Sequence, residues 1–172
     1  MRRVLLPVTF VGLFLFESLF AELWPAELFN RDFIFVPRLL MIGILFLAIY
    51  GGKTHGIIYG FIFGLLYDVF YTEIIGVYLY LFPLLAYLTA KLMKALQANL
   101  LISSIVTLLG VCVLELAVYE MNFLIHITDM PFAKFVELRL YPTSILNLAL
   151  TIIVALPLKM QIEKWADELR ND

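Results

Sequence analysis

Long apolar runs separated by short polar breaks constrain this chain more than any other feature of its sequence. Hydrophobic residues make up 63% of the 172 residues, charged residues only 15%, and the mean hydropathy is +0.99. A soluble domain is about half apolar, and a chain of this size cannot bury such an excess in one water-soluble core. Because a bilayer accepts apolar surface, the composition predicts a protein embedded in lipid.

Six of these runs are read as membrane-spanning helices. A span needs about 20 mainly apolar residues, and the runs lack the alternation of a membrane β-barrel. The predicted spans are Leu5–Trp24, Phe33–Tyr50, His55–Tyr71, Ile74–Thr89, Leu100–Phe123 and Pro142–Met160. The third and fourth are short and meet at Thr72–Glu73, so tilted or partly re-entrant segments are an alternative for them. We predict an all-α, polytopic bundle of six transmembrane helices.

The segments around the spans carry predictions of their own. Arg2 and Arg3 precede an apolar stretch, as in a signal peptide, but the stretch is long enough to predict an uncleaved first span. The longest break is Met121–Tyr141, whose Pro131–Phe135 part is predicted to lie along the membrane interface. Residues 1–160 form one six-span domain in this reading. Residues 161–172 form a short charged tail, predicted to continue the last helix as an exposed extension.

Lysine and arginine are distributed unevenly between the breaks. If the N-terminus is cytoplasmic, eight of the twelve basic residues lie in inner segments, three in outer segments, and Arg38 lies within the second span. The positive-inside rule therefore predicts that both termini are cytoplasmic. Trp24 and Trp165 lie near predicted helix ends, where aromatic residues anchor spans in the interface.

Three glycines recur every four residues in the third predicted span. Gly56, Gly60 and Gly64 share one helix face, and Asp68 continues it one turn further. Small residues at this spacing let another backbone approach closely. One interpretation is a helix–helix packing face closed by an acid that caps or pairs locally. The other is a partner or ligand contact at Asp68.

Ionisable residues inside spans are costly and suggest function. Here they are Glu17, Arg38, Glu115 and Glu120, with Glu22 near the end of the first span. In the predicted orientation all of them lie in the outer half of the membrane. Glu17 and Arg38 lie at similar depths and are predicted to pair, with Glu115 an equally possible partner for Arg38. The cluster is either a set of ion pairs that fixes helix register, or an outward-facing cavity or groove for another protein.

Polar and aromatic residues elsewhere give weaker predictions. Asn147 is placed to form a hydrogen bond between helices. Cys112 is expected to be a small buried residue, because one cysteine makes neither an internal disulfide nor a zinc site. The tyrosines near the connection of the third and fourth spans are predicted to form an aromatic belt, and these are Tyr67, Tyr71, Tyr78 and Tyr80.

Motifs for catalysis and cofactor binding are absent from the sequence. It contains no GxSxG, HExxH, Walker A or CxxC pattern, and Asp68 alone would serve an intramembrane aspartyl protease that needs two such residues. His55 and His126 lie too far apart in the predicted topology to form a metal site. No basic-aromatic run suggests nucleic acid. We predict a protein that is not an enzyme and needs no metal or cofactor.

The third and fourth spans together carry a more distinctive pattern. It reads Gly56-x3-Gly60-x3-Gly64-Leu65-Leu66-Tyr67-Asp68, followed by Gly76-Val77-Tyr78-x4-Pro83-x3-Tyr87-Leu88. This pattern resembles the central signature of the bacterial rod shape-determining protein MreD family, and Phe16-Glu17-Ser18 in the first span is similar too. The signature covers about a fifth of the chain. The length, the six spans and the small tail fit the family over the whole chain.

The resemblance implies a function and partners. MreD proteins are non-enzymatic components of the elongasome, which builds the lateral peptidoglycan wall of rod-shaped bacteria. The implied partners are MreC, and, directly or indirectly, MreB, RodA and a class B penicillin-binding protein, together with membrane lipid. The family also resembles, in fold, the substrate-binding component of energy-coupling factor transporters. On these grounds Gly56, Gly60, Gly64, Asp68 and Gly76 are the expected packing or partner surface of a cell-membrane scaffold.

A second function is weighed against this one. A substrate-binding membrane subunit of a vitamin-type transporter would have the same fold and an outward ligand pocket. Such subunits often carry an alanine-rich docking motif in the first span, and no A-x-x-x-A pattern stands out there. The sequence therefore favours the scaffold over the transporter subunit.

Overall fold

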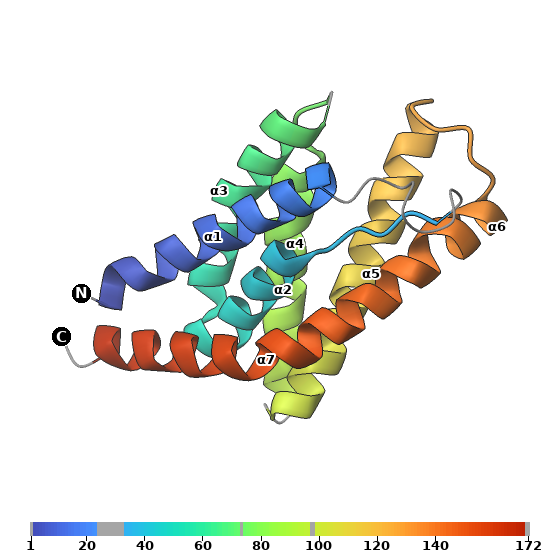
Figure 1. Ribbon diagram of the computed structural model, residues 1–172. Helices are drawn as coiled ribbons and strands as arrows, with labels where there is room; N and C mark the ends of the chain where they lie inside the picture. The colour runs from blue at the N-terminus through green and yellow to red at the C-terminus, as the bar shows by residue number, and fades with distance from the viewer. Residues whose placement is uncertain (1, 24–32, 73, 97–98, 171–172) are drawn as a thin grey trace.

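The computed structural model describes residues 2–23, 33–72, 74–96 and 99–170, and all regular structure within them is helical (Figure 1). The elements are α1 (Arg2–Leu23), α2 (Leu39–Phe46), the π-helix η1 (Leu47–Gly51), α3 (Lys53–Tyr71), α4 (Val77–Ala95), α5 (Leu100–Leu124), α6 (Phe132–Phe135), the π-helix η2 (Val136–Leu140) and α7 (Tyr141–Arg170). α2 runs directly into η1, and α6 and η2 into α7. The described residues therefore form six helical segments, and the all-α prediction is confirmed.

The centre of the bundle is the short helix α2. All eight of its residues are buried, and it contacts α1, α3, α4, α5 and α7. Its sequence is apolar on every side, and such a helix is stable only when it is enclosed. Gly43 gives room on one side, because the side chains of Phe10 and Leu13 from α1 lie against its backbone. The other helices are thus arranged around α2.

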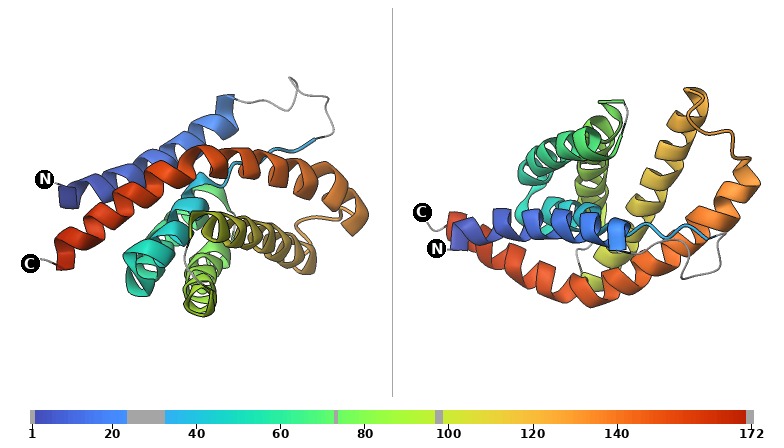
Figure 2. Two further views of the ribbon diagram at one scale, coloured as in Figure 1. Left: turned by 90° about the horizontal axis from the view of Figure 1, so that it is seen from below. Right: turned by 45° about the horizontal axis from the view of Figure 1, so that its top comes forward.

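The outer helices form two groups around this centre. α3 and α4 are antiparallel neighbours, and α5 stands beside α4, whereas α1 and α7 run antiparallel along the other side (Figures 1 and 2). The connections α3–α4 and α5–α6 lie at one end of the bundle, and the α4–α5 connection lies at the other (Figure 1). The first turn of α1 and the last turn of α7 lie close together (Figure 2).

Much of the outer surface is apolar. α5 exposes a stripe of aliphatic residues every four positions, and this stripe is Leu101, Ile105, Leu109 and Val113. Exposed apolar surface of this extent marks contact with lipid or another protein. By length and composition the helices Leu100–Leu124 and Phe132–Leu169 are able to cross a bilayer, and two shorter apolar helices are Val4–Phe20 and Leu39–Gly51.

The second predicted span differs from the structure. The sequence predicts a helix over Phe33–Tyr50, but residues 33–38 are extended and the helix begins at Leu39. Pro37 explains the difference, because proline lacks an N–H group and disfavours helical geometry in the residue before it. The extended segment lies against η2 and α7, where Ile34 N donates to Leu138 O at 2.7 Å.

The C-terminal part of the chain is more helical and more enclosed than predicted. Within the segment Pro131–Phe135, a helix begins at Phe132 and continues to Arg170, and the predicted position of this segment along the interface stays a prediction. The predicted helical tail is present, but Ile162 and Trp165 belong to the core. Trp165 is 8% exposed and packs edge-on against His55, and its expected role as an interfacial anchor stays a prediction. Trp24, the other expected anchor, lies outside the described residues.

Candidate functional site

A buried arginine lies where five helical segments meet. Arg38 immediately precedes α2, and its side chain is 2% exposed. Its Nε donates to Glu115 Oε1 of α5 at 2.5 Å, and its Nη2 lies at the same distance from that oxygen. Glu115 is 1% exposed, so both charges are removed from solvent. Charge-assisted hydrogen bonds of this length offset part of the cost of burying the pair.

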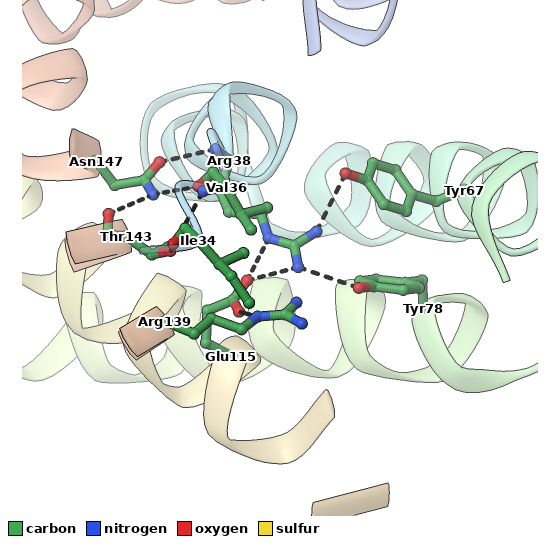
Figure 3. Close-up of polar contacts among 9 residues, drawn as sticks. All are labelled: Ile34, Val36, Arg38, Tyr67, Tyr78, Glu115, Arg139, Thr143 and Asn147. Carbon is green, nitrogen blue, oxygen red and sulfur yellow. Dashed lines mark hydrogen bonds and ion pairs between the residues drawn. The ribbon is translucent and has the colours of Figure 1, made fainter. Parts of the chain in front are cut away.

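Two tyrosines complete the coordination of this guanidinium (Figure 3). Arg38 Nη1 donates to Tyr67 Oη of α3 at 3.1 Å, and Nη2 donates to Tyr78 Oη of α4 at 3.1 Å. The guanidinium carbon also lies 5.6 Å and 5.3 Å from the two ring centroids, within the range of cation–π attraction. A guanidinium carries five N–H donors, so a buried arginine needs several acceptors at once.

A second arginine shares the same carboxylate. Arg139 of η2 donates from Nε to Glu115 Oε2 at 3.0 Å, and its side chain is 29% exposed. Each oxygen of Glu115 therefore faces a different arginine (Figure 3). Arg38, Glu115, Arg139, Tyr67 and Tyr78 are together called the network below. Within the network, Arg139 is the partly exposed member, and it presents positive charge at the surface.

Glu17 joins the network from α1. It is 3% exposed, and its Oε1 accepts a hydrogen bond from the backbone N–H of Leu40 at 2.6 Å. Leu40 lies in the first turn of α2, where N–H groups have no partner within the helix. Glu17 thus caps α2 from a neighbouring helix. Its predicted role as the ion-pair partner of Arg38 falls instead to Glu115.

The extended segment that carries Arg38 is fixed by α7. Asn147 accepts from Arg38 N at 2.8 Å and donates from Nδ2 to Val36 O at 2.8 Å. Thr143 Oγ1 donates to Ile34 O at 3.1 Å and accepts from Val36 N at 3.2 Å. These side chains satisfy backbone groups that a helix would have satisfied internally, so an irregular segment is tolerated inside the bundle (Figure 3).

A pocket opens beside the network at the end of the bundle that holds the α3–α4 and α5–α6 connections. Its volume is about 330 Å³, and its lining residues are Tyr71, Thr72, Ile74, Val77, Tyr78, Val118, Asn122, Ile127 and Arg139. Tyr78 and Arg139 belong both to the pocket and to the network. Anything bound in this pocket would therefore contact groups that Arg38 and Glu115 hold in place.

The glycine face predicted from the sequence packs inside the molecule. A Cβ on Gly60 would lie 2.9 Å from Pro83 N, and one on Gly64 would lie 2.5 Å from Tyr78 O, both in α4. A Cβ on Gly56 would lie 2.5 Å from Ala48 Cβ in η1. Only glycine allows such close approach of two backbones. This face is covered by α4 and η1 and is not open to another protein.

Asp68 caps α4 rather than facing outward. It is 0% exposed, and its carboxylate accepts from the backbone N–H groups of Gly76, Tyr78 and Leu79 at 2.8–2.9 Å. Gly76 has φ +127°, which a residue with a side chain rarely adopts, so it forms the turn that brings these groups to Asp68. The geometry is that of the local cap, the first of the two interpretations of this face.

Other predicted residues lie apart from the network. Glu120 and Glu22 are exposed, so Glu120 does not join the other three members of the predicted cluster. Cys112 is half-buried and lies 3.4 Å from Ser144 Oγ. In the described part of the chain, no three His, Cys, Asp or Glu side chains come together as a metal site would need.

Several members of the network were missed or misread in the sequence. Tyr67 and Tyr78 were expected in an aromatic belt, but they are 7% and 5% exposed and bind Arg38, whereas Tyr80 is 63% exposed. The spacing could have indicated this for Tyr67, because it lies three residues after Gly64 and so shares the buried face of α3. Arg139 was placed in a loop, since the helix over residues 132–140 was not predicted.

An apolar exterior around a charged, hydrogen-bonded interior is the arrangement of a helical integral membrane protein. The comparisons with known proteins agree with this class. Residues 1–164 match the model of the family described as "rod shape-determining protein MreD". The chain is also 38% identical over its full length to the full length of the rod shape-determining protein MreD of Bacillus subtilis (strain 168). No solved structure matches it. The chain therefore belongs to the MreD family, as its sequence pattern indicated.

Proposed function

We propose that this protein is a non-enzymatic membrane scaffold of the elongasome, required for rod shape and lateral wall synthesis. Its family membership supports the role in cell shape. In this proposal the chain crosses the cell membrane six times with both termini in the cytoplasm. It contacts MreC directly, and MreB, RodA and a class B penicillin-binding protein directly or through MreC. The likeness in fold to the substrate-binding component of energy-coupling factor transporters stays a prediction.

One observation carries the proposal: the buried network of Arg38, Glu115 and Arg139 adjoins an open pocket. Six segments converge there, because Glu17 of α1 adds to the five that hold the network together. A site built from all parts of a bundle is rigid, and rigid sites bind without a large ordering cost. We assign the pocket as the place where a segment of MreC binds, with Arg139 and Tyr78 at its inner wall.

The arrangement of the helices supports the orientation. The start of α1 and the end of α7 lie at one end of the molecule, as an even number of crossings requires (Figure 2). The pocket lies at the opposite end of α3 and α4 from Lys53, Lys91 and Lys94. With those lysines on the cytoplasmic side, the pocket faces outward.

The test fills the pocket and measures MreC binding. Ile74 lines the pocket and is 43% exposed, whereas its neighbour Ile75 is 65% exposed and does not line it. Ile74→Trp is expected to lower co-purification of MreC from the same bacterium by about tenfold, the effect of losing about 1.4 kcal/mol of binding free energy. Ile75→Trp, the matched control, is expected to leave co-purification unchanged.

Both exposed positions accept tryptophan without disturbing the core, so melting temperatures in detergent should stay within a few degrees of the unmodified protein. Loss of rod shape in cells should follow the Ile74 variant only. Equal MreC recovery with the two variants would exclude the pocket as the MreC site.

A further inference from the structure

A second groove lies far from the outer pocket, between the free ends of α1 and α7. It has a volume of about 420 Å³, and its lining residues are Leu5, Leu6, Pro157, Met160, Gln161, Lys164 and Trp165. The α1–α7 pair stands apart from α4 and α5 at this end (Figures 1 and 2). Its walls are fixed to each other, because Gln161 Nε2 donates to Thr9 Oγ1 at 2.5 Å. The groove is therefore a built feature of the fold.

The chemistry of the groove changes along α7. Along α7, Pro157 and Met160 come first, and Gln161, Lys164 and Trp165 follow toward the C-terminus. Because α1 runs antiparallel to α7 and Thr9 pairs with Gln161, Leu5 and Leu6 lie opposite the second of these groups. From Pro157 to Lys164 the helix rises by about 10 Å. The α7 wall of the groove thus passes over that distance from apolar side chains to an amide, a cation and an indole. A phospholipid passes in the same order from acyl chain to glycerol ester to phosphate.

Lys164 is the charged residue among those that line the groove, so the lining itself carries positive charge. Lys164 is exposed, and the acidic residues of the same helical stretch, Glu163, Asp167 and Glu168, do not line the groove. Glu163 lies 3.8 Å from Lys159. A basic pocket between membrane helices on the cytoplasmic side attracts anionic headgroups.

The geometry points to a binding site for one anionic phospholipid between α1 and α7, with an acyl chain against Pro157 and Met160 and the phosphate at Lys164. In the orientation proposed above, the lipid comes from the inner leaflet. The lipid site requires that the protein is inserted in a membrane, but it does not depend on the contact with MreC. An experiment can therefore disprove either proposal without disproving the other. A lipid held there would fill the space between the two terminal helices, which contact each other over only part of their length.

Trp165 allows a direct measurement, because it lines the groove and the chain has only one other tryptophan. The full chain with Trp24→Phe is reconstituted in phosphatidylcholine bilayers that contain brominated phosphatidylglycerol or, at the same mole fraction, brominated phosphatidylcholine. Bromine quenches indole fluorescence on contact. The anionic lipid is expected to bind about fivefold more tightly than the zwitterionic one, the factor contributed by one lysine next to an anionic surface.

Two substitutions at Lys164 distinguish a specific lipid site from a general attraction of anionic lipid to basic residues. Lys164→Gln should abolish the preference, and Lys164→Arg should keep it. Lys94→Gln is the matched control, because Lys94 is an exposed lysine in the last turn of α4, away from the groove, and it should keep the preference. Equal quenching by both lipids would overturn the proposal, and so would loss of the preference with Lys94→Gln. Reversal of the quenching by added inorganic phosphate would show a phosphate-ion site instead of a lipid site.

Discussion

At the scale of single residues, the central fact is a carboxylate that two arginines share. Burying Arg38 and Glu115 removes two charges from solvent, and their attraction repays that cost only where the remaining donors and acceptors are satisfied. Tyr67 and Tyr78 provide acceptors for Arg38, and Arg139 provides a donor for Glu115. The network therefore depends on all of its members being present together.

This dependence predicts an order of stability among variants. Glu115→Leu leaves Arg38 buried without an anion and should lower the free energy of unfolding by about 3–5 kcal/mol. Arg38→Met should cost less, because Glu115 keeps Arg139. The double variant should be more stable than Glu115→Leu alone, since the guanidinium that lost its anion is removed as well. Thermal unfolding in detergent measures the order.

The control is an ion pair at the surface. Glu163 is 46% exposed and lies 3.8 Å from Lys159, so Glu163→Gln should change the free energy of unfolding by about 1 kcal/mol or less. If Glu115→Leu unfolded at the same temperature as Glu163→Gln, the buried pair would not hold the helices together.

At the scale of elements, the close contact between α3 and α4 depends on glycine, and this gives a matched comparison. A Cβ on Gly64 meets the carbonyl oxygen of Tyr78 at 2.5 Å, whereas nothing lies within 4 Å of a Cβ on Gly12 in α1. Alanine is favoured over glycine within a helix by about 1 kcal/mol. Gly12→Ala should therefore stabilise slightly, and Gly64→Ala should destabilise by about 1–3 kcal/mol because the backbones must separate.

Melting temperatures of the Gly12→Ala and Gly64→Ala variants in the same detergent measure this difference in stability. A Gly64→Ala variant as stable as Gly12→Ala would mean that the α3–α4 contact is looser than described. The comparison also reports on folding alone, because the face of α3 that carries Gly64 is covered by α4. No other protein binds that face, so a loss of stability there is not a loss of partner binding.

The elements differ in how far the sequence predicts them. α3 and α5 were placed within two residues at each end, because their apolar runs are bounded by Gly52 and Asn99. The extended segment before α2 was not predicted, because its apolar residues look the same in a helix as in an enclosed strand-like segment. The side chains that make it possible, Thr143 and Asn147, lie more than 100 residues away in the chain. Local sequence carries no information about that contact.

The candidate site was likewise predicted only in part from the sequence. That Glu17, Arg38 and Glu115 lie close together followed from their depth in the predicted spans, since buried charges need partners. Which carboxylate binds Arg38 depends on how the helices are rotated about their axes, and this is set by packing of whole helices. The depth of a residue is therefore predictable from hydropathy, but its pairing is not.

At the scale of the whole molecule, two features lie at opposite ends: the pocket beside Arg139 and the paired termini of α1 and α7. Because these two features lie at opposite ends, the proposed orientation in the membrane is testable in the absence of MreC. After Cys112, the single cysteine, is changed to serine, one new cysteine is introduced at a time. Asp129→Cys in the α5–α6 connection should react with a membrane-impermeant maleimide in intact cells. Lys94→Cys and Leu169→Cys should react only after permeabilisation, because both lie at the cytoplasmic end in the proposal.

Each variant must first restore rod shape in cells that lack the protein, so that the labelled molecules are the functional ones. The three positions together also test the number of crossings between them. Asp129 and Leu169 are separated by the helix Phe132–Leu169, and Lys94 and Asp129 by α5, so each pair must lie on opposite sides if both helices cross. Labelling of Leu169→Cys from outside would place the C-terminus and the lipid groove in the outer leaflet. The basic rim at Lys164 would then face the leaflet that the positive-inside rule disfavours, and the proposed orientation would be wrong.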